Sequence, residues 1–119
     1  MIRRHARGRA AEDRARRHLE RAGLKLRNAN YRCRCGEIDL VMESRAGDIV
    51  FVEVRYRSRS DYGGAVASVD APKRRRLVRA AALYLAEQGL DRAPARFDVV
   101  AVDAGGRVEW IEGAFDAGD

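Results

Sequence analysis

Residues 36–57 have the sequence GEIDLVMESRAGDIVFVEVRYR, and this stretch decides the fold of the 119-residue chain. Side chains alternate with a period of two on both sides of its centre, which is typical of β-strands. The central Arg45-Ala46-Gly47 fits a three-residue hairpin loop, with glycine where a positive φ is needed. The stretch therefore predicts an antiparallel hairpin. Its first strand is expected to divide its side chains between two faces, with Ile38, Leu40 and Met42 on one and Glu37, Asp39 and Val41 on the other.

Two helices are predicted on either side of this hairpin in the chain. Apolar residues at spacings of four, four and three predict a helix over residues 8–22, followed by Gly23 as a stop. A second helix is predicted over residues 72–88, with Asp70 as N-cap, Pro72 in its first turn and Gly89 at its end. Each helix has an apolar stripe that can cover a sheet.

Further strands complete the expected architecture. Residues 24–28 are compatible with a short strand, residues 58–69 with a loop, and residues 96–103 and 107–111 with two more strands. A strand, helix and strand in succession form a βαβ unit, so strand 96–103 should lie parallel to the second hairpin strand. We predict an α/β fold: one domain over residues 1–119, with a small mixed β-sheet flanked by helices and flexible ends at 1–6 and 116–119.

Composition limits the function classes. The chain has 46% hydrophobic and 35% charged residues, and its uncharged runs are much shorter than the ~20 residues of a membrane span. The basic N-terminus lacks the apolar stretch of a secretory signal. Cys33 and Cys35 are too close for an easy disulfide and too few for a zinc site. A cytoplasmic protein without membrane contact is expected.

The net charge of +6 is unevenly distributed. Residues 1–35 carry twelve basic and three acidic side chains, whereas the hairpin that follows is rich in carboxylates. This pattern favours a polyanionic partner held against an acidic site, although a solvated basic face would give the same composition.

Two carboxylates of the hairpin are the strongest candidates for chemistry. If the loop has three residues, Asp39 lies opposite Glu53, with Cβ atoms ~4.5–5.5 Å apart. Two carboxylates at that separation repel each other, and a divalent cation between them removes the repulsion. Arg55 lies on the same face as Glu53 and could contact a bound anion. The alternative is an internal ion-pair cluster of Arg55 with both carboxylates, with no metal and no catalysis.

A basic segment begins the second predicted helix. Lys73, Arg74, Arg75 and Arg76 combine four cations with a helix N-terminus, an arrangement suited to phosphate. We expect contacts to a DNA backbone without base readout, although a solvated first turn is the simpler alternative. This track could continue through Arg32, Arg34 and Arg57.

Several motifs in the same order resemble the bacterial YraN-type family. They are Gly8-x-x-x-Glu12, Gly36-Glu-Ile-Asp-Leu-Val, Phe51-Val-Glu-Val-Arg-Tyr-Arg, Lys73 before a Leu/Ala-rich helix, and Arg96-Phe-Asp-Val-Val. That family consists of small proteins assigned as endonucleases by their similarity to archaeal Holliday-junction resolvases and the PD-(D/E)xK nuclease superfamily. The resemblance implies a restriction-endonuclease-like domain and Mg²⁺ or Mn²⁺ as cofactor. Branched or single-strand-containing DNA is the implied substrate, and a homodimer is left open.

The resemblance also implies roles for individual residues. Asp39 and Glu53 would ligate the metal directly, the carbonyl of Val54 would be a further ligand, and Glu12 would act through water. The superfamily pattern has lysine where this chain has Arg55, and arginine keeps the positive charge but cannot lose its proton. Two functions therefore follow: a metal-dependent DNA endonuclease, or a nucleic-acid-binding module of the same fold that lost turnover through Arg55.

Overall fold

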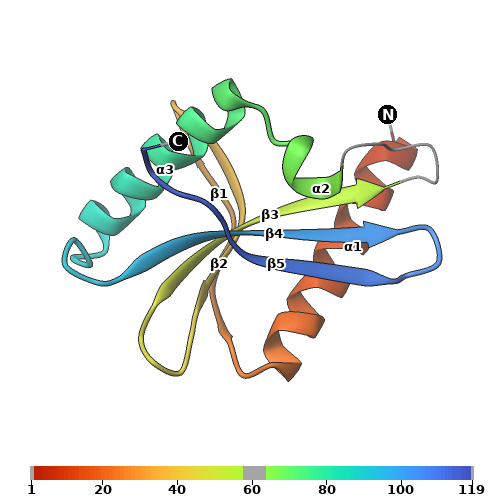
Figure 1. Cartoon of the computed structure of the whole chain (residues 1–119), viewed down its shortest axis with the longest axis horizontal. Helices are drawn as coiled ribbons and strands as arrows, with labels where there is room; N and C mark the ends of the chain where they lie inside the picture. Colours follow the sequence, from red (N-terminus) through yellow and green to blue (C-terminus); the bar gives the residue numbers. More distant parts are fainter. Residues whose placement is uncertain (1, 58–63, 119) are drawn as a thin grey trace.

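The computed structural model describes residues 2–57 and 64–118, which form a five-stranded mixed sheet with helices on both faces (Figure 1). The sheet order is β1-β2-β3-β4-β5, and only β3 and β4 are parallel. The elements in chain order are α1 (Ile2–Arg21), β1 (Lys25–Cys33), β2 (Gly36–Glu43), β3 (Ile49–Arg57), α2 (Gly64–Ala67), α3 (Ala71–Glu87), β4 (Ala95–Asp103) and β5 (Val108–Phe115). The predicted α/β fold is thus confirmed.

The β2–β3 hairpin forms with the predicted loop. The Ser44 amide donates to the Asp48 carbonyl at 2.9 Å, and Gly47 has a φ of 93°. The register runs from Glu43 opposite Ile49 to Leu40 opposite Val52. The observed ladder ends at Leu40 opposite Val52, one pair before the predicted pair of Asp39 with Glu53.

Helix α3 begins and ends where its caps predicted. The Asp70 carboxylate accepts a hydrogen bond from the Lys73 amide at 2.9 Å, and Gly89 adopts a φ of 68° just after the helix. Helix α1 starts at Ile2, six residues before its predicted start. Gly23, with a φ of 100°, follows its end.

The two faces of the sheet bury separate apolar clusters. Ala11, Ala15 and Leu19 of α1 pack on Leu40, Met42, Val50, Val52, Val100 and Val102. On the other face, Leu77, Ala81 and Tyr84 of α3 pack on Val41, Ile49, Phe51, Phe97 and Val99. The predicted alternation of β3 is confirmed, since Val50 and Val52 face α1 while Phe51 faces α3.

The predicted alternation of β2 is wrong at its first residues. Ile38 belongs to the cluster under α3 together with Val41, whereas Leu40 and Met42 face α1. Strict alternation is therefore interrupted around Asp39. Its neighbour across the β1–β2 ladder is Asn30, whose φ of 54° is left-handed, and the regular pairing omits both residues. A local backbone irregularity thus reorients the side chains next to Asp39.

Other boundaries also differ from the predictions. Strand β1 is longer than residues 24–28 because it pairs along the whole of β2, and β5 extends beyond residue 111 because it pairs with β4 as far as Phe115. Part of the predicted loop over residues 58–69 forms α2, and residues 58–63 lie outside the described residues. In the described part of the chain, no helix is both long and apolar enough to cross a membrane.

Candidate metal and phosphodiester site

The hairpin holds Asp39 against the backbone of β3. The Asp39 Oδ2 atom accepts a hydrogen bond from the Val54 amide at 2.8 Å. Beyond Leu40 opposite Val52, this side-chain contact replaces the regular ladder between the two strands. The carboxylate is therefore fixed beside the residues that follow Val52, including Glu53.

Glu53 is buried, with 3% of its surface exposed, and two cations approach one of its oxygens. Lys73 Nζ lies 3.2 Å from Glu53 Oε2, and Arg55 Nη1 lies at the same distance from that atom. The other oxygen, Oε1, is buried without a hydrogen-bond partner among the described residues. An unpaired buried carboxylate oxygen is costly to the fold.

The proximity of the two acids changes the protonation of Asp39. Its pKa is raised to about 8, first by burial and second by the Glu53 carboxylate, while the Val54 hydrogen bond acts in the opposite direction. Asp39 therefore holds a proton near neutral pH when no cation compensates the pair. A divalent ion would take the place of that proton.

Glu12 of α1 reaches the same region through Asn30. With its amide oriented to satisfy both acids, Asn30 donates to Glu37 Oε1 at 3.0 Å and to Glu12 Oε1 at 3.3 Å, so it links these two carboxylates. Burial, the largest cause, and the charges of nearby carboxylates raise the pKa of Glu12. Asn30 thus joins a carboxylate of α1 to one of β2, and Glu53 of β3 lies near enough to Glu12 to contribute to raising its pKa.

The donor set suits a hard divalent ion. Across residues 2–57 and 64–118, no three His, Cys, Asp or Glu side chains converge closely enough to enclose a metal by themselves. Mg²⁺ does not need such a cage, because it is usually held by one or two carboxylates and keeps several water or phosphate oxygens. Asp39 and Glu53, with the unpartnered Oε1, fit that requirement.

A protein-family model matches residues 11–102, which include every carboxylate of this site, and its description is "Uncharacterised protein family UPF0102". The chain belongs to the UPF0102 family. This membership confirms the resemblance to the YraN-type family.

Curated UPF0102 relatives match almost end to end. A UPF0102 protein of Dechloromonas aromatica is 57% identical over 114 residues, covering 96% of this chain and 92% of the relative. A UPF0102 protein of Cupriavidus pinatubonensis is 56% identical over 111 residues, covering 93% of this chain and 86% of the relative. Among solved structures, Pyrococcus furiosus SfsA in complex with Ca²⁺ matches with a TM-score of 0.38 and 13% identity. That match covers 91% of this chain and 63% of SfsA, so the UPF0102 chain spans less than two thirds of that protein.

The structure separates the predicted nucleic-acid-binding residues into two groups. Arg32, Arg34 and Arg75 have exposed side chains, and Arg32 lies 3.7 Å from Glu37. Arg74 is engaged internally, because its guanidinium donates to the Val69 carbonyl at 2.8 Å and covers the Phe115 ring. Arg57 lies 3.5 Å from Glu109. The exposed group is therefore available to a polyanion, whereas Arg74 supports the fold.

Sequence reasoning misses three features of the site. It assigns Lys73 to phosphate contacts at the α3 N-terminus, yet the Lys73 ammonium contacts Glu53. Arg55, the residue at the usual lysine position, also binds Ser68 through Nε at 3.0 Å and through Nη2 at 3.1 Å. The helix start at Asp70 carries the signal, because it places Lys73 in the first turn beside the end of the hairpin. Asn30 has no sequence signal, since only its left-handed φ reveals it.

Proposed function

We propose that this protein is a divalent-metal-dependent nuclease that hydrolyses phosphodiester bonds in DNA. The observation that carries the proposal is the buried, unpartnered Oε1 of Glu53 beside Asp39. Such a pair is costly to the fold and is explained by a cation that both carboxylates would hold. Bound Mg²⁺ or Mn²⁺ would supply charge stabilisation of the scissile phosphate and a more acidic water.

The ion-pair alternative accounts for the site less well. In a purely structural cluster, Arg55 would neutralise both acids, but its guanidinium and the Lys73 ammonium approach only Oε2 of Glu53. Oε1 of Glu53 has no hydrogen-bond partner among the described residues, and the contact between the two acids requires Asp39 to keep a proton near pH 7. A structural ion pair is normally retained with its lone pairs satisfied.

Each residue of the site would have a distinct task. Asp39 and Glu53 would hold the ion, with the Val54 carbonyl as a further ligand, and Glu12 would orient a water. Lys73 would provide the ammonium group that is missing at position 55, where this chain has arginine. Its charge is compact, lies within reach of Glu53 and can approach a phosphate. Arg55 would position Glu53 and the segment around Ser68.

A second candidate is a nucleic-acid-binding module without turnover, and the contacts of Arg55 favour it. A guanidinium held by Ser68 and Glu53 does not activate a water, so catalysis would depend on Lys73 alone. This candidate predicts salt-dependent DNA binding without metal-dependent cleavage.

A cleavage assay separates the two candidates. The purified protein is incubated with Mg²⁺ or Mn²⁺ and a panel of linear duplex, single-stranded, flap and four-way-junction DNA. The nuclease proposal expects cleavage of at least one substrate that is abolished by EDTA and by Asp39→Asn. If the protein binds DNA but cleaves none of the substrates, the nuclease proposal fails and the nucleic-acid-binding module is the better candidate.

Variants of the two cations then assign their roles. Lys73→Gln is expected to reduce cleavage by roughly 100-fold or more, since removal of one charge-stabilising donor typically costs about 10²–10³ in rate. Lys73→Arg serves as the matched control that keeps the charge. Arg55→Lys is expected to change the cleavage rate by no more than a few fold, because Arg55 is assigned a positioning task. A gain of about 100-fold in the cleavage rate would instead show that the side chain at position 55 takes part in catalysis.

A further inference from the structure

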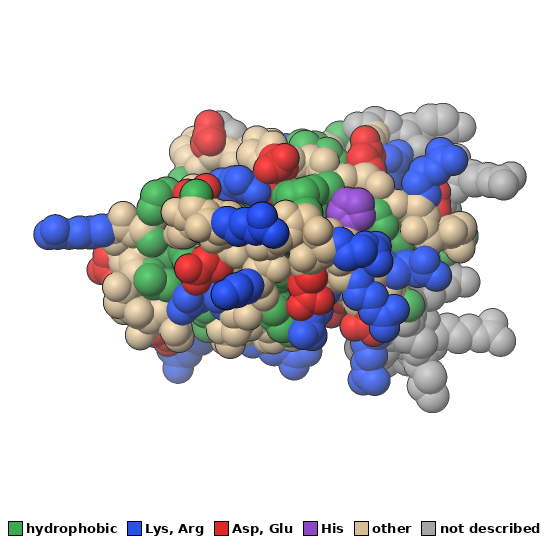
Figure 2. All heavy atoms as spheres, turned by 90° about the horizontal axis from the view of Figure 1, so that it is seen from below, with side chains coloured by type: hydrophobic (Ala, Val, Ile, Leu, Met, Phe, Trp, Pro, Cys, Tyr) green, Lys and Arg blue, Asp and Glu red, His purple; other side chains and the backbone are tan. Residues whose placement is uncertain are grey.

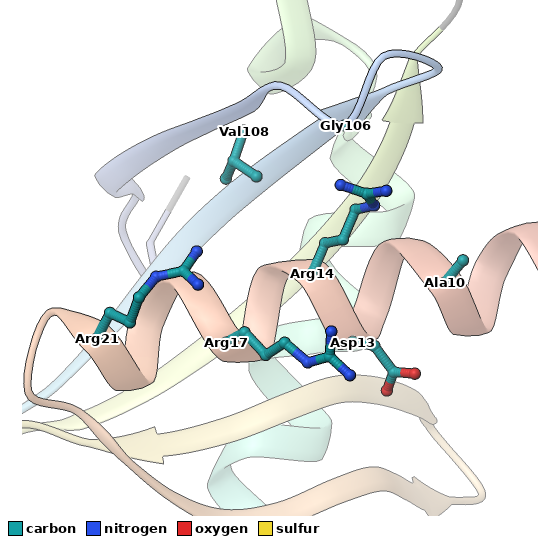
Figure 3. A pocket seen from close by; sticks show the side chains of 7 residues that line it. All are labelled: Ala10, Asp13, Arg14, Arg17, Arg21, Gly106 and Val108. Carbon is teal, nitrogen blue, oxygen red and sulfur yellow. The ribbon is translucent and has the colours of Figure 1, made fainter.

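A groove lined by three arginines lies between α1 and the β4–β5 hairpin (Figure 3). Its volume is about 330 Å³, and it is lined by Ala10, Asp13, Arg14, Arg17, Arg21, Gly106 and Val108. In Figure 3, Arg14 extends from α1 towards the β4–β5 turn that carries Gly106, Arg21 extends towards β5, and Arg17 and Asp13 lie along the outer side of the helix. One carboxylate therefore accompanies three guanidinium groups.

The groove is separate from the carboxylate site. Consecutive residues of a helix are rotated by about 100°, so Arg14 and Glu12 point to opposite flanks of α1. Their contacts agree, since Glu12 meets Asn30 of β1 while Arg14 meets the turn before β5. Glu12 and the groove therefore lie on different flanks of α1, whose diameter with side chains is about 10–12 Å.

The guanidinium groups of the groove differ from other arginines of the protein. Arg16 is paired with Glu20 and Arg27 with Glu43. Among the residues that the structure describes, Arg14, Arg17 and Arg21 form no ion pair or hydrogen bond with another side chain. Three guanidinium groups against the single carboxylate of Asp13 leave an excess of positive charge along the groove, which creates a local positive field.

The turn beside the groove is shaped to let Arg14 approach. Gly106 has a φ of 81°, and a Cβ at this position would collide with the Arg14 guanidinium. The positive φ by itself favours glycine, and with any other residue the flexible end of Arg14 would have to shift. On the face shown in Figure 2, Lys and Arg side chains are numerous and gather towards its right-hand end.

The spacing of the arginines suits an extended polyanion. Arg14 and Arg21 are seven residues apart, which is about 10 Å along the helix axis at 1.5 Å per residue. Successive phosphates of a duplex strand advance by about 3.4 Å, so this span corresponds to about three nucleotides. None of the seven lining residues is aromatic, so the groove offers no platform on which a base could stack.

We propose that this groove binds the sugar-phosphate backbone of a nucleic acid whose scissile region lies at the carboxylate site across α1. The proposal rests on the proposed function for its partner, and it adds a second contact surface to that function. Arg14, Arg17 and Arg21 bind phosphates without reading bases. They fix the strand relative to Glu12, Asp39 and Glu53.

The test measures DNA affinity as a function of salt in EDTA, where no cleavage occurs. The double variant Arg17→Gln/Arg21→Gln is compared with Arg79→Gln/Arg92→Gln, which removes the same charge from exposed positions in α3 and in the segment before β4. The slope of log affinity against log salt falls by about 0.9 for every phosphate that the protein no longer neutralises, so it should fall by about 1.8 in the groove variant. Between about 50 and 200 mM salt, wild type should therefore weaken about 12-fold more than the groove variant.

The possible outcomes are distinguishable. Equal slopes for the two double variants, with both folded by circular dichroism, would overturn the groove proposal even if cleavage is intact. The expected fall in slope with no cleavage would support the groove and refute only the nuclease. If inorganic phosphate raises the melting temperature of wild type but not of the groove variant, while the DNA slopes agree, the groove binds small anions and the backbone proposal fails.

Discussion

Asp39→Asn is expected to stabilise the metal-free protein at neutral pH, although it removes a proposed metal ligand. The folded state holds the Asp39 proton up to a pKa of about 8, whereas the unfolded chain releases it near pH 3.8. Between these values folding takes up a proton, so this carboxyl lowers wild-type stability progressively as the pH rises. Below pH 3.8 both states are protonated and the effect vanishes. Asparagine cannot ionise, keeps an acceptor for the Val54 amide, and offers an N–H₂ towards Glu53.

The magnitude follows from the shift in pKa. At pH 7 the unfolded carboxyl is fully ionised while the folded one is mostly protonated, which corresponds to about three pKa units of penalty. Since each unit equals about 1.4 kcal/mol, the variant should gain up to about 4 kcal/mol in its free energy of unfolding. The gain should shrink to below about 1 kcal/mol at pH 4.

Urea denaturation in EDTA at pH 4, 6, 7 and 8 measures this difference. Asp91→Asn, which replaces an exposed carboxylate in the turn after α3, is the matched control and should show a small difference at every pH. The reasoning is refuted if Asp39→Asn is no more stable than wild type at pH 7, or if its advantage does not depend on pH. The first outcome would mean that the Asp39–Glu53 pair is compensated within the protein, which would also remove the main argument for a metal.

Three further predictions concern the metal and the fold. Mg²⁺ at about 100 times its Kd should raise the free energy of unfolding of wild type by about 2.7 kcal/mol and leave that of Glu53→Gln unchanged, as measured by thermal melting. An equal shift in both proteins would mean that the ion binds elsewhere. Asp98→Ala should cost about 3 kcal/mol in urea denaturation without changing the Mg²⁺ effect, because this buried carboxylate accepts hydrogen bonds from Trp110 and Gly113 and pairs with an arginine. Tyr84→Phe should cost about 1 kcal/mol in the same assay, since the buried hydroxyl bonds to Asn28 at 2.8 Å; no loss would show that water replaces this bond.

The hairpin shows how much local chemistry can predict. The loop length follows from Gly47, the register of Glu43 to Leu40 follows from the loop, and Asp39 comes next, where its side chain accepts from the Val54 amide. None of these steps requires contacts from elsewhere in the chain, because a hairpin is stabilised by neighbours in sequence. The limits of α3 were predictable for the same reason, since Asp70 and Gly89 act on the backbone next to them.

The amino-acid sequence by itself determined the α/β elements, the paired carboxylates and the excess of positive charge. The tertiary structure alone decided which cations meet those carboxylates, because Lys73 and Glu53 are brought together by the packing of α3 on the sheet. It also decided that Arg74 is held inside the fold and that Arg14, Arg17 and Arg21 line a groove. The physical reason is that a long, flexible lysine or arginine side chain can reach many partners. Which partner it meets depends on elements that are distant in the sequence.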